Sequence, residues 1–341
     1  MAYERFILLD TQDDGDKYLS VWGDGTYIYV ANRTTGIRAY NFDGTNFTLL
    51  DTHRTVDYGY YRDVWGDGTY IYVANYQMGI VAYSFDGTSF TLLAAQNDGG
   101  FYYGVWSDGT YIYVANHSTG IRAYSFDGTS FTLLATQTDG GTYYGVWGDG
   151  TYIYVANYTN GIRAYSFDGT SFTLLATLDD GGTYYNVWGD GTYIYAANFA
   201  NGIRAYSFDG TSFTLLATRD DGGYYVDVWG DGVYIYIALR EDGICAYIFD
   251  GTSFTLLDTQ DDGGIYRGIW GDGTYIYAAA DDGGIYAYFF EQRPCSDFTT
   301  EGTCIAAGCY WYGDACHIEP PPPAGKPGLN PGTMAKMMDV I

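Results

Sequence analysis

Side chains that could do acid–base or metal chemistry are scarce in this sequence. The 341 residues include three histidines, His53, His117 and His317, and no two of them lie at a spacing typical of metal ligands. No Ser, His and Asp set typical of nucleophilic catalysis is recognised. Carboxylates are plentiful but occur in near-identical copies, whereas catalysis usually needs one asymmetric arrangement. The sequence therefore favours a protein that is not an enzyme and has no cofactor or metal.

Tyrosine is the residue type best suited to binding here, because its ring stacks while its hydroxyl forms hydrogen bonds. One tyrosine recurs in seven similar segments, near asparagines such as Asn75 and Asn198. These side chains predict a funnel that could bind sugars; the alternative is that the tyrosines only pack between structural units and the asparagines cap strand ends. The seven tyrosines are Tyr18, Tyr61, Tyr102, Tyr143, Tyr184, Tyr225 and Tyr266. The residues that follow them vary: Leu19, Arg62, Tyr103, Tyr144, Tyr185, Val226 and Arg267.

Aspartate followed by glycine also recurs, in two sets. Asp-Gly between strand-like runs is a strong hairpin signal, because both turn positions need positive φ. Rings of such aspartates could attract Ca²⁺ or a basic partner. One carboxylate per turn falls short of the six to eight oxygens that Ca²⁺ takes, so turn formation is the favoured interpretation. The sets are Asp24, Asp67, Asp108, Asp149, Asp190, Asp231 and Asp272, and Asp43, Asp86, Asp127, Asp168, Asp209 and Asp250.

The charge balance excludes some partners. Lys plus Arg total 15 against 41 Asp plus Glu, which gives a formal net charge of −26. Such a chain repels nucleic acid and anionic membranes, whose binding needs basic residues. No apolar run is long enough to span a bilayer, and the N-terminal residues do not resemble a secretory signal. We therefore expect no nucleic-acid binding, no membrane insertion and no recognisable signal peptide.

Seven copies of one repeat must position these side chains. The phrase Val-Trp-Gly-Asp-Gly-Thr-Tyr recurs, with small changes, at Val21, Val64, Val105, Val146, Val187, Val228 and Ile269. Periods of about 40–45 residues with several short strand-like runs are typical of β-propeller blades. The sequence therefore predicts an all-β, seven-bladed propeller over residues 1–290. Its first-strand tryptophans are Trp22, Trp65, Trp106, Trp147, Trp188, Trp229 and Trp270.

Each blade is expected to hold four strands. In one repeat these are residues 143–147, 151–156, 162–167 and 170–176, rich in aromatic and β-branched residues. The hairpin turns should lie on one face of the ring, and the second-to-third loops and inter-blade links on the other. Arginines at one third-strand position are expected to form cation–π pairs with tyrosines between blades. They are Arg38, Arg122, Arg163 and Arg204, and Cys245 replaces them once as a predicted buried free thiol.

The two ends of the repeat array predict how the ring closes. The last repeat stops after Phe290, where the fourth strand is missing, and residues 6–14 match residues 254–262 almost throughout. The N-terminal strand can therefore complete the last blade and remove two exposed sheet edges. Over roughly residues 6–290 the chain resembles β-propellers of the LVIVD-repeat type, through its Phe-Thr-Leu-Leu, Tyr-Tyr-Gly-Val-Trp and Tyr-Ile-Tyr-Val-Ala-Asn strands. That resemblance implies the fold and an occurrence on cell surfaces and in virus-like gene sets, but no single activity.

Residues 291–341, which follow the seven repeats, differ from them in composition. Residues 291–317 are predicted to form a small module with two disulfides, of open connectivity, among Cys295, Cys304, Cys309 and Cys316; zinc is the rival interpretation, but the spacing is poor. Residues 318–341 combine a Pro-rich linker with an apolar tail that we expect to contact another subunit. The tail residues concerned are Met334, Met337, Met338, Val340 and Ile341. Possible glycosylation sequons begin at Asn32, Asn46, Asn116 and Asn157.

Two functions remain as expectations. The first is a non-enzymatic structural or display subunit of an extracellular assembly, such as a filament or virion appendage, that associates with itself through the C-terminal tail. The second is a multivalent, lectin-like propeller that binds glycans through the tyrosine funnel. Disulfides imply an oxidising destination, so we expect an extracellular or virion-surface location.

Overall fold

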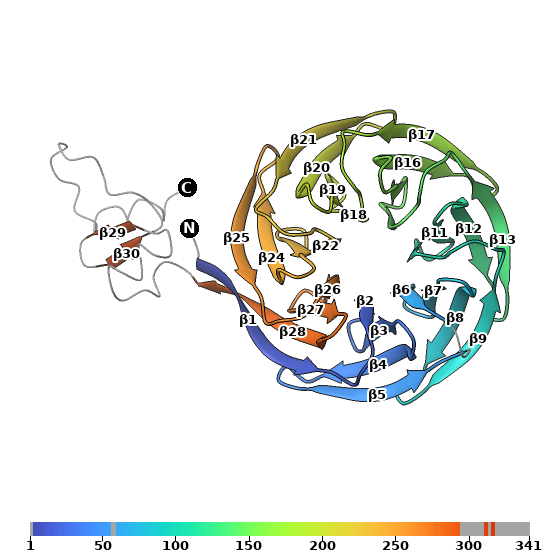
Figure 1. Cartoon of the computed structure of the whole chain (residues 1–341), viewed down its shortest axis with the longest axis horizontal. Coiled ribbons are helices and arrows are strands. Elements are labelled where there is room, and N and C mark those ends of the chain that lie inside the picture. The colour runs from blue at the N-terminus through green and yellow to red at the C-terminus, as the bar shows by residue number, and fades with distance from the viewer. Residues whose placement is uncertain (1–2, 56–58, 294–309, 313–314, 318–341) are drawn as a thin grey trace, which may run out of the picture. The chain divides into compact units, whose positions relative to one another are not determined.

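Seven four-stranded antiparallel sheets surround a central axis in the computed structural model (Figure 1). The structure describes residues 3–55, 59–293, 310–312 and 315–317. Residues Arg5–Phe290 form one compact unit, the propeller. Nowhere in the described part of the chain is there a helix long and apolar enough to cross a bilayer. The predicted all-β, seven-bladed fold is confirmed.

The blades follow one another around the ring in chain order. The first comprises β2 (Tyr18–Gly23), β3 (Ile28–Asn32), β4 (Gly36–Phe42) and β5 (Phe47–His53), and the second β6 (Tyr61–Gly66), β7 (Ile71–Asn75), β8 (Gly79–Phe85) and β9 (Phe90–Gln96). The third comprises β10 (Gly104–Ser107), β11 (Ile112–Asn116), β12 (Gly120–Phe126) and β13 (Phe131–Gln137). The fourth comprises β14 (Val146–Gly148), β15 (Ile153–Ala156), β16 (Ile162–Phe167) and β17 (Phe172–Leu178). The fifth comprises β18 (Asn186–Gly189), β19 (Ile194–Ala197), β20 (Ile203–Phe208) and β21 (Phe213–Arg219). The sixth comprises β22 (Asp227–Gly230), β23 (Ile235–Ala238), β24 (Ile244–Phe249) and β25 (Phe254–Gln260).

The seventh blade is assembled from both ends of the array. It comprises β26 (Tyr266–Gly271), β27 (Tyr275–Ala280), β28 (Gly284–Arg293) and, as its outer strand, β1 (Tyr3–Gln12). The N-terminal strand therefore closes the ring, as the sequence predicted. A separate two-stranded hairpin, β29 (Tyr310–Tyr312) with β30 (Ala315–His317), lies in the C-terminal region. The rest of the predicted Cys-rich module and the tail lie outside the described residues.

Tryptophan packing on glycine joins successive blades around the axis. The indole of Trp106 in the third blade lies on Gly148 in the fourth, and a methyl group added to that glycine would sit 2.6 Å from Cζ3 of the indole. Trp106 also stacks on Tyr113 of its own blade, with ring centroids 5.7 Å apart. Six of the seven junctions have this tryptophan–glycine pair, and the exception is the junction of Trp65 with the third blade, where Ser107 replaces glycine. A side chain at the glycine position would therefore separate the blades.

The arginines at the third-strand position stack on tyrosine within a blade. The Arg163 guanidinium lies 5.3 Å from the ring centroid of Tyr143, which belongs to the same blade. It also donates hydrogen bonds to the carbonyl oxygens of Gly140, at 2.7 Å, and Asp139, at 3.0 Å, in the preceding link. The predicted cation–π pairs exist, but their placement between blades was wrong, because each guanidinium serves to hold the inter-blade link. Cys245, which replaces one of these arginines, is a free and fully buried thiol, as predicted.

Three aspartates reinforce the outer strands where the ring closes. The Asp258 carboxylate in the sixth blade accepts a hydrogen bond from the backbone N–H of Phe6 in β1, at 2.7 Å. Asp10 accepts one from Phe47, at 2.7 Å, and Asp51 accepts one from Phe90, at 2.8 Å. These bonds tie the sixth blade to the seventh, the seventh to the first and the first to the second. The same position holds alanine in the remaining blades: Ala94, Ala135, Ala176 and Ala217.

Removing the Asp258 carboxylate should weaken closure. In an Asp258→Ala variant the part-buried N–H of Phe6 loses its acceptor, which should lower the free energy of unfolding by about 1–3 kcal/mol. Chemical denaturation of the full chain measures this change. Thr259→Ala, at the exposed neighbouring position, serves as the control and should change stability by less than about 0.5 kcal/mol. Equal effects of the two substitutions would contradict the assigned role.

Candidate functional site

The loop face, which carries the second-to-third loops and inter-blade links, is hollowed at the axis. The cavity has a volume of about 340 Å³, within the range of ligand pockets, and we call it the cup. Its lining comes from all seven blades: Leu19, Arg33, Arg62, Asp63, Tyr103, Gly104, Tyr144, Gly145, Tyr185, Asn186, Val226, Asp227, Arg267 and Asp281. Seven of these residues occupy one repeat position, which is the variable residue after each recurring tyrosine. The blades are therefore nearly identical, whereas the side chains that line the cup differ from blade to blade.

Three tyrosines from successive blades form one wall of the cup. Tyr103, Tyr144 and Tyr185 stand next to one another, with ring centroids 4.6 and 5.2 Å apart. Each ring is stacked on an aromatic side chain of the second-to-third loop of its own blade. The stacked pairs are Tyr103 with His117 at 5.0 Å, Tyr144 with Tyr158 at 4.9 Å and Tyr185 with Phe199 at 4.9 Å. We call the three cup tyrosines the tyrosine arc.

The residues that support the arc have strained backbones. Tyr158 and Phe199 have φ values of 39° and 27°, in a region that side chains other than glycine rarely adopt. Each forms an isolated bridge with the buried tyrosine that precedes the next blade, Tyr184 and Tyr225 respectively. Strain of this kind costs about 1–3 kcal/mol per residue and is commonly found at functional sites. Arg240 of the sixth blade has the same feature, with a φ of 56° and a bridge to Tyr266, so the strain belongs to this form of the loop.

Guanidinium groups continue the lining of the cup, with Arg62 beside the arc and Arg267 in the seventh blade. The Arg62 guanidinium lies 4.6 Å from the ring centroid of Tyr103 and 5.1 Å from that of Tyr76. Arg267 donates two hydrogen bonds to one carboxylate oxygen of Asp281, at 2.8 and 3.1 Å. Burial and the adjacent positive charge of Arg62 lower the pKa of His117. This part of the lining is therefore cationic, and an imidazole beside it is held neutral.

Two carboxyl groups lie at the floor of the cup and join inner strands. Asp63 accepts hydrogen bonds from the Ser20 hydroxyl in the first blade, at 2.6 Å, and from the Val105 N–H in the third, at 2.9 Å. Asp227 accepts them from the Asn186 side chain in the fifth blade and from the Ile269 N–H in the seventh. Burial raises the pKa of Asp63 to about 6. Burial, reinforced by the charge of Asp63, raises the pKa of Asp227 to about 7.

The recurring tyrosines predicted to line the funnel lie elsewhere. All seven, Tyr18, Tyr61, Tyr102, Tyr143, Tyr184, Tyr225 and Tyr266, are 0% exposed. The Tyr143 hydroxyl contacts that of Tyr165 at 3.2 Å and accepts a hydrogen bond from the Asp139 N–H at 3.0 Å. These tyrosines anchor the inter-blade links, so their predicted placement in the funnel wall was wrong. The residues one position later line the cup instead.

Burial also decides which of the asparagines predicted for glycosylation are accessible. Asn32, Asn116 and Asn157 are 0% exposed, and the amides of the last two donate to carbonyl oxygens of Gly99 and Gly140. Asn116 and Asn157 therefore cap strand ends, and the folded ring exposes none of the three for glycosylation. Asn46, in the turn between β4 and β5, is the exposed member of the four predicted sequons.

Cys295, Cys304 and Cys309 and the five tail residues lie outside the described residues, as does the side chain of Cys316.

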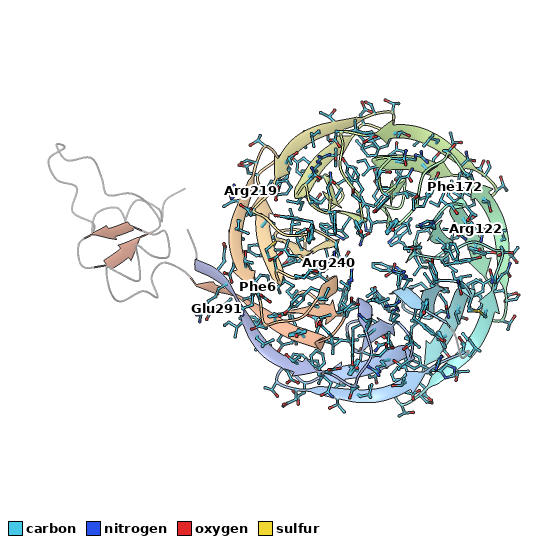
Figure 2. All side chains as sticks on the ribbon, viewed as in Figure 1. Phe6, Arg122, Phe172, Arg219, Arg240 and Glu291 are labelled. Atoms are coloured by element: carbon cyan, nitrogen blue, oxygen red, sulfur yellow. The ribbon has the colours of Figure 1, made fainter. Side chains whose placement is uncertain are left out.

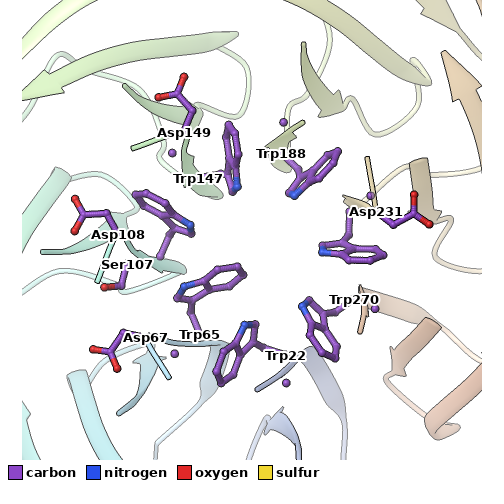
Figure 3. Close-up of a pocket in the computed structure, with 18 of the residues that line it drawn as sticks. Trp22, Trp65, Asp67, Ser107, Asp108, Trp147, Asp149, Trp188, Asp231 and Trp270 are labelled. Atoms are coloured by element: carbon purple, nitrogen blue, oxygen red, sulfur yellow. The ribbon is translucent and has the colours of Figure 1, made fainter. Parts of the chain in front are cut away.

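The hairpin face carries a second hollow, of about 1150 Å³, lined by the seven tryptophans and their Asp-Gly turns (Figure 3). Each aspartate is engaged in its turn: Asp24 accepts hydrogen bonds from the N–H groups of Thr26 and Tyr27, both at 2.8 Å, and from the Tyr29 hydroxyl. The labelled aspartates of Figure 3 point away from the axis. Within the described residues, no group of three or more His, Cys, Asp or Glu is placed to hold a metal ion. The aspartates therefore have a turn-forming role.

The buried carboxyl groups of Asp63 and Asp227, which we call the floor carboxyls, should make the free energy of unfolding fall as pH rises. Their folded-state pKa values of about 6 and 7 exceed the ordinary aspartate value of about 3.9, so the folded state holds these protons more tightly than the unfolded state. Their effect favours the folded state most below about pH 4 and is lost as pH rises through 6–7. Asp227→Asn should therefore raise Tm at pH 8 relative to wild type and flatten the decline between pH 5 and 8. The exposed Asp220→Asn is the control for net charge; an unchanged pH profile in Asp227→Asn would refute the assignment.

Comparison with known proteins supports the fold. No protein-family model matches the chain, and no curated protein matches it. Among solved structures, a catalytically inactive virginiamycin B lyase from Staphylococcus aureus, solved with quinupristin, superimposes with a TM-score of 0.68. The match covers 84% of this chain and 99% of the lyase at 12% sequence identity. At that identity the similarity establishes a shared propeller fold and leaves the activity of this chain open.

Proposed function

We propose that this propeller binds a carbohydrate in the cup. The observation that carries the proposal is the tyrosine arc, Tyr103, Tyr144 and Tyr185, braced from behind by stacked aromatic side chains. Sugar rings pack their C–H faces on aromatic rings, while tyrosine hydroxyls and guanidinium groups bond to sugar hydroxyls. A cavity of about 340 Å³ suits one or two sugar units.

The arrangement supports one site per ring. Tyrosines occupy the cup position in three consecutive blades, whereas the other four blades present Leu19, Arg62, Val226 and Arg267. A sevenfold set of equivalent sites would need the same side chain in every blade. Multivalent binding, if the protein has it, therefore comes from association of several rings.

We further propose that the bound sugar is not turned over. Asp63 and Asp227 are the cup carboxyls with raised pKa values, and both already accept several hydrogen bonds from neighbouring blades. Such bonds fix the carboxyl groups as ties between inner strands. Because a propeller of similar fold is a lyase, incubation of each bound glycan with the protein, followed by mass spectrometry, is the direct test; a new product would overturn this part of the proposal.

Truncating the middle of the arc should abolish glycan binding. In Tyr144→Ala the sugar loses its central stacking surface, so signals on a glycan array should fall at least tenfold, as expected when an aromatic contact worth about 1.5 kcal/mol or more is lost. The fall should be confirmed by calorimetry on the best-bound glycan.

A matched control exists in the same blade. Tyr152 is also half-buried but lies on the hairpin face, so Tyr152→Ala should lose similar packing and keep wild-type binding. Absence of any glycan binding by the wild-type protein would remove the proposal. Equal losses in the two variants would attribute the effect to the fold instead of the cup.

A second proposal concerns assembly. We propose that the ring is displayed extracellularly, on a filament or virion surface, and associates with itself through residues 318–341. The support is compositional: four cysteines within residues 295–316 suit an oxidising location, and the Pro-rich segment is followed by a tail with three methionines, Val340 and Ile341.

Deleting the tail should convert an assembled protein into single rings. Light scattering and electron micrographs of the full chain should show oligomers or fibres, and the chain ending at residue 317 should give particles of one ring. A variant with Met334, Met337 and Met338 changed to serine should resemble the deletion, because the apolar contact is lost while the chain length is kept. Identical particle sizes for all three proteins would sink the proposal.

A further inference from the structure

The cup gathers positive charge in a molecule whose net charge is −26. Of the 15 Lys and Arg residues, six lie in loops, inter-blade links and strand starts of the loop face: Lys17, Arg33, Arg54, Arg62, Arg240 and Arg267. Three of the six, Arg33, Arg62 and Arg267, line the cup, and Arg240 lies at the inner edge of the ring (Figure 2). The hollow on the hairpin face, by contrast, is lined by seven aspartates and no basic residue. Asp63, Asp227 and Asp281 also line the cup, so its excess of positive charge depends on the protonation of Asp63 and Asp227.

The positions of the basic residues follow from the repeat. Arg62 and Arg267 occupy the same repeat position as the tyrosine arc, in the second and seventh blades. Leu19 of the first blade stands between them. Because the blades follow chain order around the ring, Tyr144 and Tyr185 of the fourth and fifth blades stand across the axis from this group. A ligand that fills the cup thus meets aromatic rings on one side and guanidinium groups on the other.

Arg62 is the guanidinium best placed to meet a ligand. The faces of Tyr76 and Tyr103 hold it at 5.1 and 4.6 Å. None of the described residues accepts a hydrogen bond from it, and its Nε is buried, so a ligand in the cup would bond to its two terminal nitrogens. Arg267 differs, because Asp281 already balances its charge at 2.8 Å and also lies 3.6 Å from Lys17. A guanidinium fixed by aromatic faces matches the planar, bidentate geometry of a carboxylate.

We propose that the cup recognises an acidic sugar, with the sugar ring on the tyrosine arc and its carboxylate on Arg62 and, secondarily, Arg267. This specificity rests on the proposed carbohydrate binding and narrows its ligand class to carboxylated monosaccharide units, such as uronic or sialic acids. The floor carboxyls do not oppose it in mildly acidic solution, because burial keeps Asp63 and Asp227 protonated below their pKa values of about 6 and 7.

Calorimetry on the full chain at pH 5.5 tests the proposal with three methyl glycosides. These are the neutral β-glucoside, the β-glucuronide, which differs from it only in the carboxylate, and the α-glycoside of N-acetylneuraminic acid. At least one acidic ligand should bind about tenfold or more tightly than the glucoside, the factor expected of a charge-assisted pair worth about 1.5 kcal/mol. Arg62→Gln should remove that advantage, so that the acidic ligands bind this variant no more tightly than the glucoside does.

Arg219→Gln is the matched control. It removes one positive charge at the end of an outer strand, where Arg219 pairs with Asp221, and it should leave all three affinities at wild-type values. Glucoside binding equal to that of both acidic ligands would overturn the acidic specificity while sugar binding stands. Equal losses of acidic-ligand affinity in Arg62→Gln and Arg219→Gln would overturn the role of Arg62. No binding of any of the three ligands would overturn both proposals.

Discussion

The contact of each axial tryptophan with a glycine of the next blade sets the spacing on which the ring depends. The indole stacks on a tyrosine of its own blade and fills the place that a side chain of the next blade would otherwise take. Repeated around the axis, this contact fixes how closely the inner strands approach one another. Ser107 is the one exception, and the Trp65 it meets has a buried indole N–H without a partner in the described residues. The regular contact thus tolerates one local departure.

A ring built in this way leaves only certain positions free to vary. Many side chains used for blade packing, such as the buried tyrosine at or just before the start of each inner strand, face similar neighbours seven times and are the same residue type in all seven copies. The buried third-strand position is an exception, because Val81, Cys245 and Tyr286 replace arginine there. The residue after each buried tyrosine faces the open cup instead, and there the copies carry leucine, valine, arginine or tyrosine. Asp10 and Asp258 lie at the two junctions of the blade that closes the ring, and Asp51 forms the same bond at the next junction.

The fold was predictable from the sequence because its determinants are local and repeated. Asp-Gly turns, strand patterns and the match between residues 6–14 and 254–262 each refer to one blade or one junction. The site was less predictable, because recurrence of Tyr143 and its equivalents fits either a binding funnel or packing between blades. Their recurrence instead reflects a buried role, in which each hydroxyl meets a second tyrosine and an inter-blade link. The arginine partners were misplaced for a similar reason: sequence spacing does not say which tyrosine lies across the strand.

Seven copies within one chain thus act as an internal comparison that separates packing from recognition. A position that has the same residue type in all copies is explained by the common architecture, because its side chain is buried in every blade and needs no ligand. A position whose residue type differs from the other copies only in a few adjacent blades is not explained by the common architecture. Tyrosine occupies the cup position in three adjacent blades, where each ring stacks on a loop side chain of its own blade, and Arg62 and Arg267 occupy the same position in the second and seventh blades. These differences converge on one cavity, which is the reason for proposing a bound molecule there.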